Sequence, residues 1–256
     1  MDLRGINSAN GIRGYEVNRF SRALIAHSRH VLRLAAYGSI LALLPLYALP
    51  SQAAHKCELG QPLLLADLDW DSARLHNAIA SFIIENGYGC TTSLVAAGTI
   101  DAMEQMMVGG IDVMMEVWQD NVQGLWGDTE ENRLLVDFGI NLPDAEQGWY
   151  VPLYVIKSDI ARNIEPSASD LHSVTDLARY KHIFAEQGGE HGLLMNCPDS
   201  WACAEVNSRK LLAYGLDTQH FSRNTRSGDD LAEYIVTRYA AGKPFLAYYW
   251  TSTRIL

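Results

Sequence analysis

Tryptophan occurs in this chain at positions where it could recognise a cation. Four of the six tryptophans lie beside Asp, Glu, Ser or Thr at the ends of apolar runs: Trp70, Trp118, Trp201 and Trp250. A tryptophan that only fills a core usually lies inside such a run. Indole faces that converge on a cleft attract a quaternary ammonium ion through the ring quadrupole. We therefore expect these rings to line a cation-binding cleft, although any one of them also fits a core position.

The remaining candidates are weaker. Trp126 is expected in a core, and Trp149 fits a core position and a ligand contact equally well. Trp70 is expected to support the cleft as well as to touch the ligand. Asp69 and Asp71 could act as a catalytic carboxylate pair, but on a turn before a helix they are expected to cap that helix and shape the mouth of the cleft.

Apolar runs and turn residues predict alternating strands and helices. In the first half, strands are expected at residues 63–66, 92–96 and 111–115, with helices between them. This β-α-β-α-β order predicts a parallel sheet. In the second half, helices are expected at residues 170–180, 204–214 and 229–241, and a buried strand at 245–250. Ligands of open α/β sheets bind outside the carboxyl ends of the strands, where Trp118 and Trp250 fall.

The N-terminal region has the pattern of an export signal. Arginines between residues 19 and 33 precede an apolar run at residues 34–49, and small residues follow at 50–54. This order is typical of a secretory signal peptide, and the run is shorter than the roughly 20 residues of a membrane span. We expect residues 1–54 to be a signal peptide and extension outside the fold, and the protein to be periplasmic. An uncleaved N-terminal anchor is the alternative.

The charge of the exported part restricts its partners. Residues 1–53 contain six arginines and two acids, which leaves 14 basic and 28 acidic side chains and a net charge of −14 in the rest. This acidity argues against nucleic acid or an anionic membrane as a partner.

The cysteines all follow the signal region. Four of them, an even number, favour two disulfides in an oxidising compartment: Cys57, Cys90, Cys197 and Cys203. Three pairings are possible. Cys57 precedes the first predicted strand and Cys90 opens the second, which would place them side by side. A zinc site is the weaker alternative, because neither pair has the spacing of a zinc knuckle.

Sequence motifs for catalysis are not found. The chain has no nucleophile elbow, phosphate-binding loop or zinc-protease motif, so we expect neither an enzyme nor a metal or cofactor site. The alternative is an exported enzyme that acts on a cationic metabolite, with Asp69, Asp71 or Glu116 as acid or base.

Six stretches in the same order resemble one family over roughly residues 60–256. The family is that of periplasmic substrate-binding proteins of ABC importers for glycine betaine, proline betaine and related quaternary ammonium compounds. The stretches are Asp69-Trp70-Asp71-Ser72, Gly87-Tyr88, Glu116-Val117-Trp118, Gly148-Trp149-Tyr150-Val151-Pro152, Cys197-Pro198-Asp199-Ser200-Trp201-Ala202-Cys203 and Lys243-Pro244-Phe245 to Trp250-Thr251.

The resemblance implies a two-lobed α/β fold of the type II periplasmic binding proteins, with an aromatic cage around a trimethylammonium group. By motif match the cage residues are Trp118, Trp201 and Trp250. Candidate donors to a ligand carboxylate are the backbone amides of the 67–69 turn and of Ala202 and Cys203. The resemblance also implies a disulfide across the Cys197–Cys203 loop, and ABC permease subunits at the inner membrane as partners in osmoprotection.

The resemblance also implies domain limits. We expect a first lobe at residues 55–147, a second at 148–244, and a crossover strand back toward the first lobe at 245–256. Family members continue further, so we expect the C-terminal part of the first lobe to be absent from this truncated chain. Ser252-Thr253 stands where the family commonly has Pro and often His, which leaves the choice between a betaine and choline open.

Overall fold

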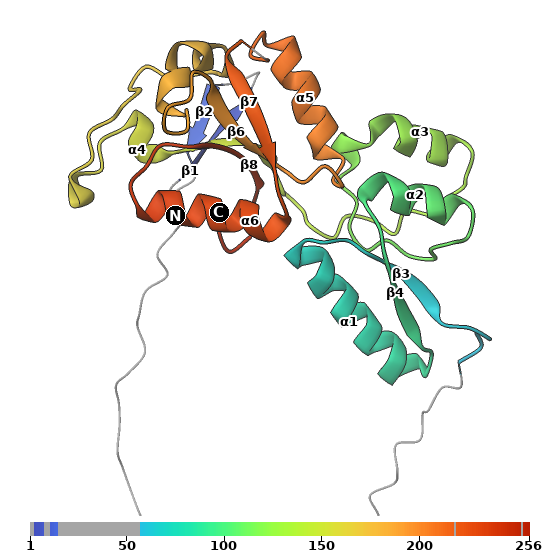
Figure 1. Cartoon of the computed structure of the whole chain (residues 1–256). Coiled ribbons are helices and arrows are strands. Elements are labelled where there is room, and N and C mark those ends of the chain that lie inside the picture. Colours follow the sequence, from blue (N-terminus) through green and yellow to red (C-terminus); the bar gives the residue numbers. More distant parts are fainter. Residues whose placement is uncertain (1–2, 8–10, 15–56, 218, 252) are drawn as a thin grey trace, which may run out of the picture.

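The computed structural model describes residues 3–7, 11–14, 57–217, 219–251 and 253–256. Of the segment expected to be a signal peptide and extension, residues 3–7 and 11–14 are described, and its arginines at 19–33 and apolar run at 34–49 lie outside the described residues. The described chain forms two α/β lobes, each with its own sheet (Figure 1). Among the described residues, none of the helices has both the length and the apolar character that crossing a membrane requires.

The first lobe, residues 57–146, is built on two parallel strands. These are β3 (Leu63–Asp67) and β4 (Thr92–Ala96), with α1 (Asp71–Tyr88) as the connection between them. The predicted third strand at 111–115 is reduced to one bridge between Val113 and Leu65. One reason is that the Asp112 carboxylate accepts from the Leu64 N–H at 2.8 Å, so a side chain stands in for a strand carbonyl.

Helix α1 of the first lobe ends at a glycine, and it begins without the side-chain cap that was expected from Asp71. Gly89 closes α1 at φ 68°, in the left-handed region that favours glycine. Residue Trp70 precedes α1, and neither Asp71 nor Ser72 caps it by a side chain. Helix α2 (Thr99–Met107) has Gly98 as its N-cap. Further along lie η1 (Gln119–Asn121) and α3 (Gln123–Glu131).

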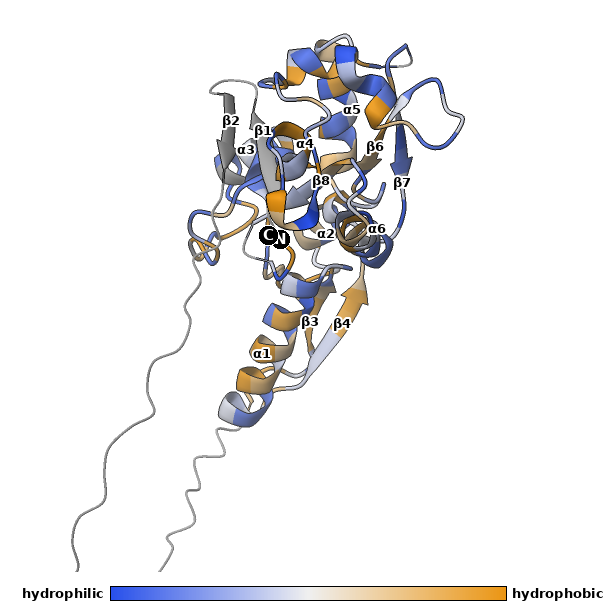
Figure 2. Ribbon diagram, turned by 90° about the vertical axis from the view of Figure 1, so that its left-hand side faces the viewer, coloured by the Kyte–Doolittle hydropathy of each residue, from blue (hydrophilic) through white to orange (hydrophobic). Residues whose placement is uncertain are grey.

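Much of the outer face of α1 is apolar and exposed. Leu75 is 60% exposed and Phe82 68% exposed, and the hydrophobic colour runs along this helix in Figure 2. The loop after α3 likewise exposes Phe138 and Ile140. The first lobe therefore contributes less to the buried core than the second lobe does.

The second lobe, residues 147–256, holds a six-stranded sheet in the order β2-β1-β5-β8-β6-β7. Its elements from this part of the chain are β5 (Gln147–Pro152), α4 (Leu153–Ile156), η2 (Ile160–Arg162), η3 (Val174–Ile183), β6 (Gly192–Asn196), α5 (Cys203–Ala213), β7 (Phe221–Thr225), α6 (Gly228–Ala240) and β8 (Leu246–Trp250). The 3₁₀ helix η3 takes the place of the helix predicted at 170–180.

Strand β8 differs from the expected crossover strand toward the first lobe. It is buried at every position, and it pairs antiparallel with β5 and parallel with β6. These two neighbours satisfy its backbone and make it a central strand of the second lobe. Its register places Trp250 opposite Gln147, where the two lobes meet.

Two short strands lie within the N-terminal extension. Strands β1 (Leu3–Asn7) and β2 (Gly11–Gly14) form a hairpin, and β1 pairs antiparallel with β5. The physical reason is that β5 would otherwise be an edge strand with unpaired backbone groups.

The two disulfides join the pairs that were expected from the sequence and from the family resemblance. One links Cys57 to Cys90 beside the two strands of the first lobe, and the other links Cys197 to Cys203 at the start of α5. The second bridge closes the loop that carries Trp201.

Candidate functional site

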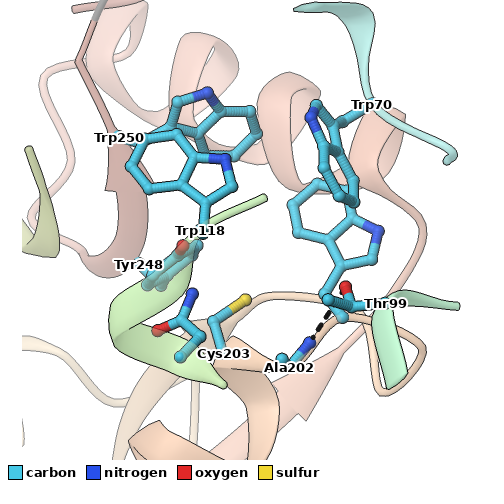
Figure 3. A pocket seen from close by; sticks show the side chains of 9 residues that line it. Trp70, Thr99, Trp118, Ala202, Cys203, Tyr248 and Trp250 are labelled. Carbon is cyan, nitrogen blue, oxygen red and sulfur yellow. Dashed lines mark hydrogen bonds between the residues drawn. The ribbon is translucent and has the colours of Figure 1, made fainter. Parts of the chain in front are cut away.

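A pocket lies between the two lobes and is walled by tryptophan. Its cavity volume is only about 20 Å³, so the rings nearly close it, and the wider space that includes open solvent is about 320 Å³. Nine residues line it: Trp70, Thr99, Trp118, Asn121, Trp201, Ala202, Cys203, Tyr248 and Trp250. Figure 3 shows Trp118 and Trp250 on one side and Trp70 on the other, and Trp201 packs against Trp70. We call this the indole pocket.

The rings pack edge to face. Ring centroids lie 5.1 Å apart for Trp70 and Trp201, 5.4 Å for Trp201 and Trp250, and 6.4 Å for Trp118 and Trp250. The interplanar angles are 71–74°. Because an edge directed at a face joins the positive rim of one ring to the negative face of another, this arrangement stabilises the cluster. It also orients ring faces in different directions around one space.

Two carboxylates hold three of the four indole N–H groups. Glu116 Oε1 accepts from Trp70 Nε1 and from Trp118 Nε1, each at 2.9 Å. Asp69 Oδ1 accepts from Trp201 Nε1. Glu116 is only 3% exposed, so its two bonds to indoles are shielded from water, and a hydrogen bond to a charged group is stronger in such surroundings. The rings are thereby fixed in orientation as well as in position.

Polar side chains complete the wall near Trp250. The Tyr248 hydroxyl and the Asn121 Nδ2 both donate to Gln147 Oε1 at 2.8 Å. Burial raises the pKa of Tyr248 well above its usual value, so this phenol stays a hydrogen-bond donor at physiological pH. The arrangement fixes an amide and a phenol beside the rings.

The floor of the pocket is the start of α5. Ala202 is the N-cap and Cys203 the first helical residue, so backbone N–H groups and the positive end of the helix dipole lie at the pocket. The Ala202 N–H donates to Thr99 Oγ1 of the first lobe at 3.4 Å. Thr99, the first residue of α2, uses its hydroxyl in this contact between the lobes.

Two glycines allow the lobes to approach closely. A Cβ on Gly98 would lie 2.7 Å from the carbonyl oxygen of Ser200. A Cβ on Gly228 would lie 3.3 Å from the Asp69 carbonyl oxygen of the first lobe, and 2.9 Å from the ring of Trp201 in its own lobe. The Thr99 N–H donates to the same Ser200 carbonyl at 3.0 Å. These contacts bring the loop around Trp201 against the first lobe.

Most of the predicted site residues come together, with exceptions. Trp70, Trp118, Trp201, Trp250, Ala202 and Cys203 line the pocket, and Asp69 reaches it through Trp201. Trp149 does not: it lies in the core of the second lobe and donates to Asn207 Oδ1 at 2.9 Å. The Asp71 carboxylate faces solvent.

Four residues of the site were not singled out for binding from the sequence. Thr99, Asn121 and Tyr248 line the pocket, and Glu116 anchors two rings. Only Glu116 carried a usable signal. Residues two apart on an extended segment point to the same side, so Glu116 and Trp118 were candidates for a contact. Within the described residues, no group of three or more His, Cys, Asp or Glu is placed to hold a metal ion.

Comparisons with known proteins agree with this geometry. A family described as the substrate binding domain of the ABC-type glycine betaine transport system (OpuAC) matches residues 61–256. No curated protein matches the chain. The chain belongs to the OpuAC family, which confirms the resemblance stated from the sequence. The family description is one of substrate binding and not of catalysis.

Solved structures show the same two-lobed α/β fold. A glycine betaine, L-proline-binding protein (ProX) from Borrelia burgdorferi has 15% identity and a TM-score of 0.57, covering 75% of this chain and 64% of that one. A choline-binding protein in complex with choline has 13% identity and a TM-score of 0.60, covering 75% and 60%. Lactococcal OpuAC complexed with glycine betaine has 15% identity and a TM-score of 0.55, covering 75% and 66%. The chain thus spans about three fifths to two thirds of their lengths.

Proposed function

We propose that this protein is the substrate-binding component of an ABC importer and captures glycine betaine or a related quaternary ammonium compound in the indole pocket. The observation that carries the proposal is the convergence of Trp118, Trp201 and Trp250, with Trp70, on one space between the lobes. Family membership over residues 61–256 supports the same reading.

The chemistry of the pocket suits a methylated cation. A trimethylammonium group cannot donate a hydrogen bond, so it is held by ring faces and by burial of its methyl groups. Each favourable ring contributes about 0.5–2 kcal/mol. Several rings together are compatible with micromolar affinity, about 8 kcal/mol, after the cost of ordering is subtracted.

Binding must rearrange the rings. Trp201 and Trp250 are in direct edge-to-face contact at 5.4 Å, so a cation that contacts both faces has to separate them. This separation would change the surroundings of the indoles, and hence the tryptophan fluorescence. Ligand binding can therefore be followed by the tryptophan fluorescence of the unmodified protein.

The start of α5 suits an anionic group at the other end of the ligand. Free N–H groups at a helix N-terminus bind carboxylates well. A ligand carboxylate at Ala202 and Cys203 would compete with Thr99 Oγ1, which accepts from Ala202 N–H at a long 3.4 Å. If a ligand carboxylate replaces this weak bond, the pocket prefers a betaine over choline, because choline has no carboxylate.

A choline-specific protein is the second candidate, and the polar side chains of the pocket favour it. Thr99, Asn121 and Tyr248 offer hydroxyl and amide groups that a ligand hydroxyl could bond. The exported enzyme has less support, because Asp69 and Glu116 are both engaged by indole N–H groups.

The setting of the protein belongs to the same proposal. We place it in the periplasm, where it would deliver its ligand to permease subunits in the inner membrane. Cleavage of the signal peptide would also remove β1 and β2 and leave β5 as the edge strand of the mature protein. Nucleic acid is not proposed as a partner, since the exported part carries a net charge of −14.

Calorimetric titration of the whole chain tests the proposal. The probes are glycine betaine, proline betaine, choline and carnitine, with glycine as the unmethylated control. We expect micromolar binding of at least one methylated compound and none of glycine. Binding of choline alone would select the second candidate. No binding of any methylated compound by folded protein would refute the function.

A further inference from the structure

Glu116 is a buried carboxylate whose hydrogen bonds go mainly to the walls of the indole pocket. Its Oε1 accepts from Trp70 and Trp118, and also from Ser72 Oγ at 3.1 Å. Trp70 lies on one side of the pocket with Trp201, and Trp118 lies on the other side with Trp250 (Figure 3). One oxygen atom therefore links the two sides.

Helix α1 holds the carboxylate from behind. Ser72 and His76 lie one turn apart on α1, and His76 Nδ1 is 3.2 Å from Glu116 Oε2. The carboxylate is thus fixed by one helix and two indoles, with little freedom to move. Removing its partners would leave a buried charge unsatisfied, which is costly, so the group and the rings keep each other in place.

The choice of a carboxylate is specific to the pocket. Three indoles of the pocket donate to carboxylates, whereas Trp149 in the core of the second lobe donates to the neutral amide of Asn207. An uncharged acceptor is therefore sufficient to anchor a buried indole in this fold. His76, 3.2 Å from Glu116 Oε2, is one candidate partner for the negative charge. A cation in the pocket would be another, because charges attract more strongly away from bulk water.

We propose that Glu116 is a positioning residue that sets the orientation of Trp70 and Trp118 across the indole pocket, and whose negative charge makes the pocket prefer a cation to an uncharged ligand of the same shape. The inference rests on the proposed function, since it assumes that a quaternary ammonium compound binds there. It adds a basis for selectivity that the rings alone do not provide.

The test separates hydrogen bonding from charge. Glu116→Gln keeps an oxygen acceptor but removes the charge, and Glu116→Leu removes both. The matched control is Asn207→Leu, which removes the acceptor of the one described indole bond outside the pocket. Each protein is titrated with choline and with 3,3-dimethylbutan-1-ol, in which carbon replaces the charged nitrogen, and with glycine betaine and its carbon analogue 3,3-dimethylbutanoate.

We expect Glu116→Gln to weaken binding of the cationic compounds about tenfold while changing binding of the carbon analogues less than about twofold. We expect Glu116→Leu to weaken both, with a loss of about a hundredfold for the cations. Asn207→Leu should lower the thermal midpoint and leave every affinity within about twofold. The decisive quantity is the ratio of the affinity for the cation to the affinity for its carbon analogue. A purely structural role for Glu116 would leave this ratio unchanged.

The outcomes distinguish the two proposals. If the wild-type protein binds no methylated cation, the proposed function fails. If the wild type binds cations and Glu116→Gln keeps the wild-type ratio, the inference about Glu116 is overturned while the proposed function stands. Should Glu116→Leu fail to fold by circular dichroism, the ratio measured with Glu116→Gln still decides.

Discussion

The four indoles of the pocket are held in place by different contacts. Trp70 and Trp118 share Glu116, and Trp201 bonds Asp69. Trp250 instead stacks on Tyr249 at 4.4 Å and meets Trp118 and Trp201 edge to face. Hydrogen bonds hold Trp70 and Trp118 in orientation before a ligand arrives, which lowers the entropy cost of binding, whereas Trp201 and Trp250 still have to separate.

At the residue scale, we expect Trp201→Ala and Trp250→Ala each to weaken binding of the best methylated ligand by about 2 kcal/mol, a factor of roughly thirty. Each loses one ring face and the contact between the two rings. Ligand-induced quenching of tryptophan fluorescence should disappear in both. Trp126→Phe, on α3 and outside the pocket wall, is the control and should bind normally. Normal affinity in both alanine variants would remove the cage from the proposal.

The same scale shows what the sequence could reveal of the site. Trp118, Trp201 and Trp250 stand out because polar residues flank them, and Ala202 and Cys203 follow Trp201 directly. Glu116 partners Trp70 across 46 positions, and Asp69 partners Trp201 across 132. Pairings at such separations depend on the packing of the lobes and carry no local signal. Trp149 lies between Gly148 and Tyr150, so the sequence left its role open, and its strand turns it into the core.

Among the elements, the loop before α5 and the start of α2 bring the lobes together. Gly98 has φ −74°, which any residue can adopt, so its small size and not its flexibility is what the contact requires. The Thr99 N–H bond to Ser200 depends on this approach. This contact holds Trp201 and the N–H groups at the start of α5 in position at the indole pocket.

At the element scale, we expect Gly98→Ala to hold the lobes apart and weaken ligand binding about tenfold, because the new Cβ would lie 2.7 Å from a backbone oxygen. Calorimetry gives the affinity, and small-angle X-ray scattering should show a larger radius of gyration. Gly87→Ala is the matched control, since its Cβ would meet nothing within 4 Å. Equal affinity and equal size for the two variants would contradict the steric role of Gly98.

For the whole molecule, the larger sheet holds most of the buried tyrosines. Burial raises the pKa of Tyr150 to about 12 and that of Tyr249 to about 12, and lifts those of Tyr154 and Tyr248 further. In the unfolded chain a tyrosine ionises near pH 10. Between about pH 10 and 12 the unfolded state therefore releases protons that the folded state retains, and the free energy of unfolding falls as pH rises.

We expect the urea midpoint to be steady below about pH 9 and to fall steeply between pH 10 and 12. Over that range the free energy of unfolding should fall by at most about 1.4 kcal/mol per pH unit for each buried tyrosine. Tyr150→Phe should reduce the slope, and Tyr88→Phe on the exposed face of α1 should not. A midpoint that stays constant to pH 12 would contradict the burial of these phenols.

The sequence by itself determined the order of elements and the membership of the chain in its family. Apolar runs bounded by Gly, Asp and Thr predicted β3, β4 and β8 and the helices α1, α5 and α6 to within a few residues, because hydrophobic period and turn residues act locally. The family match over residues 61–256 follows from the same motifs that the sequence displays.

Only the tertiary structure decided the pairing of distant parts. It made β8 a central strand of the second lobe, placed β1 against β5, and reduced the segment around Val113 to a single bridge. It also brought two carboxylates, one of them buried, to three indoles. Such choices depend on which edge, charge or ring remains unsatisfied after local structure has formed, and that is a property of the packed chain and not of any short segment of it.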